Sequence, residues 1–198
     1  ELKEISTLDE LIEIANEIDT NNVVSEEANF LRNLISAIKW KYQNQTIKMR
    51  QIVKCLAFKP FDELENKEEY VNLVEEYKNW VKEKIEVVKE NLVIEEINGK
   101  KIVFVEGMKN LPVYEIFNAI KNNLNFDILC VIYRKVNLYE NEIYTKLEFR
   151  TNSNVDVFKI ASVFDGGGHK FAAGATIKGL ITKDEIISKI KNFLQTSN

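Results

Sequence analysis

Two kinds of hydrophobic pattern divide the chain at about Leu92. Before that point, apolar residues recur every three or four positions, which is the spacing of a helix with one buried face. This spacing predicts three helical regions, at Thr7–Ile18, 30–38 and 70–88. Pro60 separates the second region from the third and predicts a bend between them. The first half of the chain is therefore expected to be helical.

Beyond Leu92 the apolar runs become short and strand-like. Runs 91–97 and 101–107 flank Asn98-Gly99, a dipeptide typical of two-residue hairpins, and so predict two antiparallel strands. A helix is expected to begin at Pro112. The remaining runs predict strands at 127–136, 142–151 and 174–179, a short helix at 155–164 and a closing helix at Lys183–Leu194.

Together these elements predict an α/β protein. Strands and helices alternate in the second half, which predicts helices packed on a mixed sheet of about five strands. The expected organisation is a helical N-terminal half, residues 1–91, followed by a mixed β-sheet domain with flanking helices, residues 92–198. A chain of 198 residues with 45% hydrophobic content can bury a core as one domain or as two small ones.

Composition narrows the class of protein. Cys55 and Cys130 lie far apart in hydrophobic surroundings and have no CxxC or Cys/His spacing, so we expect reduced core cysteines. No apolar run approaches the ~20 residues of a membrane span, and the N-terminus lacks a signal-peptide pattern. These features predict a cytoplasmic protein with no membrane partner. The chain opens with Glu1 rather than methionine, which suggests a fragment of a longer protein.

The net charge of -4 hides a strong segregation of charge along the chain. Segment 28–61 has no acidic residue and a local charge of +7, whereas segment 62–97 carries twelve acidic residues against five lysines. In one interpretation, the two helical segments simply complement each other. In the other, part of the basic segment forms a strip that tracks phosphates and stacks bases of a single strand. The strip would consist of Lys39, Trp40, Lys41, Tyr42, Lys48 and Arg50.

The sequence FDGGGHKFAAG, residues 164–174, concentrates four of the seven glycines and the only histidine. The predicted elements place it as a loop between a helix and a strand. Consecutive glycines let backbone amides approach an anion and form a concave nest, and His169 could donate to a phosphate or stack on a base. The alternative is a tight turn with an exposed histidine.

The stretch 147–179 resembles the C-terminal, DHH-associated domain of the DHH phosphoesterase superfamily, and the resemblance extends from about Leu92 to the C-terminus. That superfamily includes RecJ exonucleases, nanoRNases, pAp phosphatases and cyclic-dinucleotide phosphodiesterases. The matching positions are the arginine-serine strand end at Arg150 and Thr151, the helix at Asp156, Val157, Ile160 and Ala161, and the GGGHxxAAG loop.

The resemblance implies that the loop and arginine bind the terminal phosphate and the sugar or base of a nucleotide or single strand. The implied site residues are Arg150, Thr151, Gly166, Gly167, Gly168, His169, Ala172, Ala173 and Gly174. Arg150 would make a bidentate phosphate contact, and Thr151 keeps the hydroxyl of the usual serine. Asp165 stands where many relatives have a fourth glycine. Its carboxylate should weaken phosphate binding unless it points away or pairs with a base.

Hydrolysis in the superfamily is carried out by a separate N-terminal domain that holds two manganese ions with aspartates and histidines. Here His169 is the only histidine, and the aspartates show no ligand spacing. The sequence therefore predicts no catalytic residues, metal site or cofactor in this chain, and no phosphodiester hydrolysis by it alone. Manganese would belong to the DHH domain of a parent enzyme.

Two functions fit these features. The chain could be the substrate-binding half of a DHH-family nuclease or phosphoesterase, with a short oligonucleotide or nucleotide as its ligand. Alternatively, it could be a RecJ-like factor that naturally lacks the catalytic domain and binds DNA within a replication-helicase or repair complex. The sequence does not distinguish DNA from RNA or a dinucleotide.

Overall fold

A computed structural model describes residues 8–20, 22–137 and 141–196. The chain divides into two compact units, Glu1–Glu83 and Lys84–Asn198, and the division falls within helix α5 (Glu68–Glu90). No helix in the described ranges is both long and apolar enough to cross a bilayer.

The first unit is helical, as predicted. It contains α1 (Leu8–Asp19), α2 (Glu26–Lys41), α3 (Thr46–Phe58), α4 (Phe61–Glu65) and the first part of α5. Ser25 caps α2 by accepting a hydrogen bond from the Ala28 amide at 3.2 Å. The core includes the fully buried side chains of Leu34, Leu64 and Tyr77. Thr7, the expected start of the first helix, lies outside the described residues.

Helices α3 and α4 were not predicted by the apolar spacing. Ile52 is the buried residue of α3, so this helix has too narrow a buried face to show a clear stripe. Pro60 lies between the two helices and directly precedes α4, where a proline needs no amide hydrogen bond.

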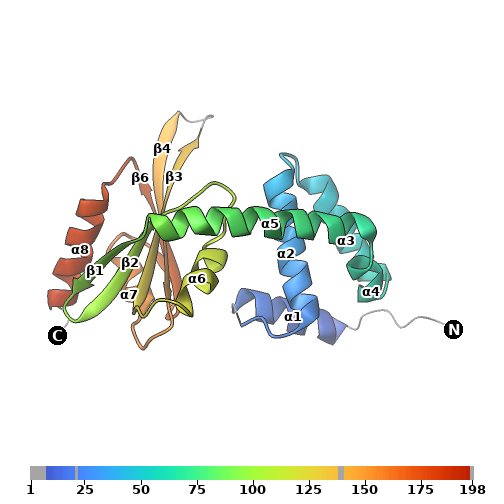
Figure 1. Ribbon diagram of the computed structural model, residues 1–198, viewed down its shortest axis with the longest axis horizontal. Coiled ribbons are helices and arrows are strands. Elements are labelled where there is room, and N and C mark those ends of the chain that lie inside the picture. The colour runs from blue at the N-terminus through green and yellow to red at the C-terminus, as the bar shows by residue number, and fades with distance from the viewer. Residues whose placement is uncertain (1–7, 21, 138–140, 197–198) are drawn as a thin grey trace. The chain divides into compact units, whose positions relative to one another are not determined.

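The second unit is a six-stranded mixed sheet with flanking helices (Figure 1). Its strands are β1 (Val93–Ile97), β2 (Lys100–Glu106), β3 (Ile128–Asn137), β4 (Glu142–Thr151), β5 (Gly167–His169) and β6 (Ala172–Lys178). Their spatial order is β1-β2-β3-β4-β6-β5, and β2 and β3 are parallel while the other neighbours are antiparallel. The helices are α6 (Val113–Lys121), α7 (Val157–Ser162) and α8 (Lys183–Thr196). The predicted α/β class is confirmed.

The Asn98-Gly99 hairpin is also confirmed. Both residues have positive φ, 55° at Asn98 and 71° at Gly99, as a type I′ turn requires. The turn joins β1 to β2 in antiparallel register, with Ile97 opposite Lys100.

One face of the sheet carries the main core of this unit. Phe104, Cys130 and Phe149 pack there with Ile160 of α7 and Ile186 of α8. Figure 1 shows α6 on the opposite side of the sheet from α8. The two faces therefore differ in their cover, and the alternation along each strand decides which side chains reach which face.

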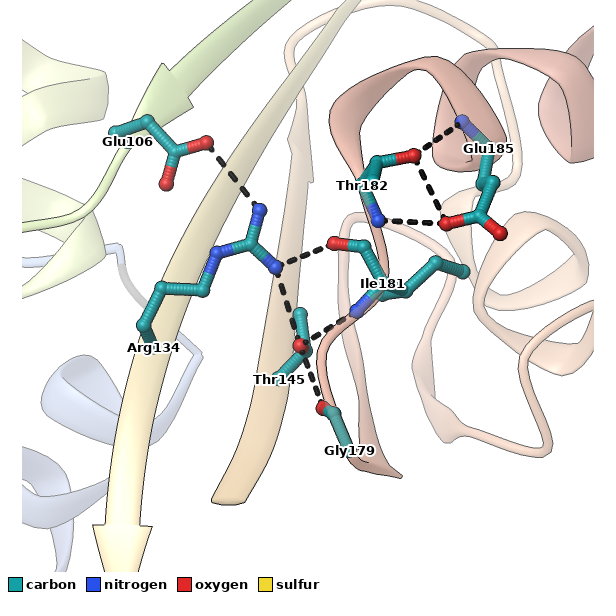
Figure 2. A network of polar contacts seen from close by, with 7 residues as sticks. All are labelled: Glu106, Arg134, Thr145, Gly179, Ile181, Thr182 and Glu185. Atoms are coloured by element: carbon teal, nitrogen blue, oxygen red, sulfur yellow. Dashed lines mark hydrogen bonds and ion pairs between the residues drawn. The ribbon is translucent and has the colours of Figure 1, made fainter.

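A polar network joins the end of β6 to the start of α8 (Figure 2). The buried Thr145 hydroxyl accepts hydrogen bonds from Arg134 Nη1 at 3.1 Å and the Ile181 amide at 3.2 Å, and donates to the Gly179 carbonyl at 2.9 Å. Arg134 also donates to the Ile181 carbonyl at 2.6 Å and contacts Glu106 at 3.4 Å. These bonds fix the connection that carries α8 back onto the sheet.

The prediction that 164–174 is a loop between a helix and a strand was wrong in part. Gly167–His169 form strand β5, and β6 begins at Ala172 rather than at Gly174. The sheet therefore has six strands instead of five. A strand of two glycines and an exposed histidine has no hydrophobic alternation, so the sequence pattern could not reveal it.

Candidate functional site

The pairing of strands β4, β6 and β5 sets the layout of the site. Residues paired across antiparallel strands place their side chains on the same face of the sheet. Arg150 pairs with Ala172, which pairs with His169, so these three form one row across the strands. Glu148 and Gly174 begin a second row, which ends at Gly167. Small residues thus occupy the middle of both rows.

An open pocket of about 440 Å³ lies over these strands. Its volume is within the range of small-ligand sites. It is lined by Lys146, Glu148, Arg150, Asp165, Gly166, Gly167, Gly168, Ala172, Ala173, Gly174, Ala175 and Thr176. The absence of large side chains at Ala172 and Gly174 leaves space between the charged side chains of β4 and strand β5.

Charged side chains of alternating sign come from β4. Lys146, Glu148 and Arg150 are two residues apart and so share one face. Glu148 accepts a hydrogen bond from Lys146 and lies 3.5 Å from Arg150 Nη2. Lys146 and Glu148 were not predicted as site residues, although the alternation of the predicted strand places both on the same face as Arg150.

Arg150 is held in place but has hydrogen-bonding capacity left. Its Nη1 donates to the Phe149 carbonyl at 2.9 Å, while its buried Nε has no hydrogen-bond partner among the described residues. Burial lowers the pKa of the Arg150 guanidinium, and the nearby Glu148 carboxylate opposes that shift. An arginine remains charged at neutral pH, so the side chain brings a fixed positive charge to the pocket.

The three consecutive glycines differ in what their surroundings require. A Cβ at Gly166 would lie 2.3 Å from the Gly174 carbonyl oxygen, and one at Gly168 would lie 2.6 Å from the Ala172 carbonyl oxygen. A Cβ at Gly167 would have no heavy atom within 4 Å. The fold therefore excludes side chains at Gly166 and Gly168 but leaves the space at Gly167 open.

Asp165 precedes these glycines and lines the same pocket. Its φ is 56°, a left-handed conformation that aspartate and asparagine adopt more readily than most residues. This conformation gives a physical reason why a glycine would also suit the position.

Two of the predicted site residues do not line the pocket. The Thr151 side chain is buried, and its hydroxyl donates to the Asp127 carbonyl at 2.6 Å and accepts from the Ser153 amide at 3.0 Å. Its single proton is therefore used within the fold. His169 is exposed on β5, in the row of Arg150 but beyond Ala172.

The predicted basic strip lies in the first unit. Lys39, Trp40 and Lys41 end α2, Tyr42 caps it, and Lys48 and Arg50 belong to α3. Lys41 forms an ion pair with Glu76, and Lys48 with Glu69, both on α5. The hydrogen bond to Glu69 raises the pKa of Lys48. These pairs are what the complementary-charge interpretation predicts.

The aromatic residues of this strip also have partners within the unit. The Trp40 ring lies 6.1 Å from Tyr77 and 5.6 Å from Trp80, and Lys48 Nζ lies 5.5 Å from the centre of the Tyr42 ring. The use of the strip for nucleic acid stays a prediction.

Salt dependence of binding tests the strip. We expect the double variant Lys41→Gln/Lys48→Gln to lower the free energy of unfolding by about 1 kcal/mol, since exposed ion pairs contribute little. The slope of log affinity for single-stranded DNA against log salt should stay unchanged, because both charges already have carboxylate partners. A clearly shallower slope would instead place these lysines on phosphates.

The described part of the chain contains no candidate metal centre. No group of three or more His, Cys, Asp and Glu side chains there is arranged to hold a metal ion. The described residues therefore do not fit the two-metal centre that the resemblance implies for a separate domain, and no hydrolytic step is derived from them.

Comparisons with known proteins agree with the fold and identify the second unit as a DHH-associated domain. The family model for the DHHA1 domain matches residues 92–196. The match spans more than half of the chain, and the protein belongs to this family. A search of curated proteins found no match.

Two solved structures share the fold. One is a pGpG-specific phosphodiesterase, PggH from Vibrio cholerae, with a TM-score of 0.59 and 13% identity, over 96% of this chain and 67% of that chain. The other is described as the DHH domain of a member of a family of ribosomal proteins, with a TM-score of 0.57 and 13% identity, over 96% of this chain and 47% of that chain. The chain thus spans about two thirds of the first and about half of the second.

Proposed function

We propose that the pocket over β4, β6 and β5 binds the terminal phosphate and adjoining nucleotide of a nucleotide or short single strand. The observation that carries this proposal is the charged Arg150 guanidinium, a fixed hydrogen-bond donor group that lines an open pocket. A phosphate oxygen is a strong acceptor for such a donor. The open space at Gly167 would let the same ligand approach the backbone closely.

In this proposal the chain is the substrate-binding half of a DHH-family phosphoesterase. Membership of the DHHA1 family supports it, as does the likeness to a solved structure that is described as a phosphodiesterase of pGpG. That likeness extends over 96% of this chain and so includes the helical unit. Hydrolysis and manganese binding would require residues beyond those described.

An open pocket also suits a ligand longer than one nucleotide, because the rest of the strand can leave it towards solvent. For that reason we include short single strands of DNA or RNA among the proposed ligands. A RecJ-like role in a replication or repair complex is the alternative, and it shares this binding step.

A titration against paired ligands tests the proposal. The panel contains short single strands of DNA and RNA, each with a 5′-phosphate or a 5′-hydroxyl, together with cyclic dinucleotides. We expect the 5′-phosphorylated strands to bind at least ~10-fold more tightly than their 5′-hydroxyl counterparts, since one charge-assisted contact has about that effect. Equal affinity of the two forms would overturn the proposal.

A further inference from the structure

The charges around the pocket do not suit a phosphate alone. Lys146 and Arg150 contribute two positive charges, and Glu148 and Asp165 contribute two negative ones. The formal charges of the lining therefore cancel. A ligand that matches this pocket needs an anionic group for the guanidinium and, elsewhere, hydrogen-bond donors for a carboxylate.

The two carboxylates differ in whether hydrogen bonds and ion pairs within the protein already occupy their oxygens. Glu148 is 18% exposed and is held by Lys146 and Arg150. Asp165 is exposed, and in the described part of the chain no hydrogen bond or ion pair occupies its carboxylate. Asp165 is therefore the acceptor that remains for a ligand, and the Arg150 guanidinium is the donor group in the same pocket.

We propose that Asp165 accepts hydrogen bonds from the Watson–Crick edge of a guanine base, so that the pocket prefers guanine nucleotides. This inference rests on the proposed function. A carboxylate has two acceptor oxygens and no donor. Guanine presents two adjacent donors on that edge, N1–H and N2–H₂, and can engage both oxygens at once.

The other bases match a carboxylate less well. Adenine and cytosine each place a ring-nitrogen acceptor beside their amino group, and this acceptor would face a carboxylate oxygen. Uracil and thymine have one N–H between two carbonyl acceptors. An unpaired or repelled polar group at this point costs affinity, which is how a polar site discriminates between bases.

Binding of 5′-phosphorylated dinucleotides tests the inference. We expect the unmodified chain to bind pGpG at least ~10-fold more tightly than pApA, the effect of one good bidentate contact with a base. Inosine lacks the N2 amino group, so pIpI should fall between the two. In Asp165→Asn the affinity for pGpG should fall by roughly tenfold while that for pApA stays or rises, because asparagine presents one acceptor and one donor.

Asparagine tolerates the positive φ of this position, so Asp165→Asn is expected to fold normally. Asp184→Asn on α8, which does not line the pocket, is the matched control and should leave all affinities unchanged. The deoxy ligand pdGpdG, which lacks the ribose 2′-hydroxyls, distinguishes a contact of Asp165 with the base from a contact with the sugar. If it binds far more weakly than pGpG, and Asp165→Asn abolishes that difference, Asp165 contacts a ribose hydroxyl and the inference fails.

The remaining outcomes separate the inference from the proposed function. Equal binding of pGpG and pApA, with both far tighter than their 5′-hydroxyl forms, would overturn the guanine preference and leave the phosphate site intact. If no dinucleotide binds more tightly than its 5′-hydroxyl form, the proposed function itself fails.

Discussion

Arg150→Ala is expected to weaken binding of a 5′-phosphorylated oligonucleotide by roughly 10- to 100-fold, with little change for the 5′-hydroxyl form. A hydrogen bond to a charged group contributes about 1.5–3 kcal/mol, and the Arg150 guanidinium lines the pocket in which it would form one with a phosphate oxygen. Isothermal titration of both ligands against the unmodified chain and the variant measures the difference.

Arg150→Lys is the informative companion variant. Lysine keeps the charge but loses the planar fork, so the loss of affinity should be smaller than in Arg150→Ala. Lys183→Ala, which removes a positive charge from α8 outside the pocket lining, controls for net charge. Equal losses for the phosphorylated and hydroxyl ligands would show that Arg150 does not contact the phosphate.

Elements with a buried face or a strict turn requirement could be predicted from the sequence. Asn98-Gly99 specified its hairpin because both turn positions need positive φ. Helix α5 showed its apolar stripe because Leu73, Tyr77 and Val81 are buried at helical intervals. Strand β5 lacks both signals, since it pairs with β6 through its backbone and has no buried side chain.

The site could be predicted only where a motif marked it. The glycines of residues 164–174 were found through their concentration in one segment and Arg150 through the resemblance, and the structure brings them to one pocket. Lys146 and Glu148 lie in an ordinary strand sequence and enter the pocket through the alternation of β4 and its pairing with β6. Thr151 matches the motif by residue type, but its hydroxyl is bonded to Asp127, a contact between distant segments that no local pattern shows.

Two neighbouring glycine variants are expected to separate folding from binding. In Gly168→Ala the new Cβ would lie 2.6 Å from the Ala172 carbonyl oxygen at a φ of 139°, and we expect the free energy of unfolding to fall by about 3 kcal/mol. In Gly167→Ala the methyl group meets no heavy atom within 4 Å, so stability should change by no more than about 0.5 kcal/mol. Urea denaturation followed by circular dichroism measures both.

Ligand binding should be weakened more by Gly167→Ala than by Gly168→Ala, when affinities are compared for the folded fraction of each variant. The methyl group of Gly167→Ala would occupy space that the ligand needs, and affinity for a 5′-phosphorylated oligonucleotide should fall by about tenfold. Gly99→Ala, with a φ of 71° and an open environment at the β1–β2 turn, controls for backbone strain alone. It should cost about 1 kcal/mol of stability and leave affinity unchanged. Unchanged affinity in Gly167→Ala would mean that no part of the ligand lies over this glycine.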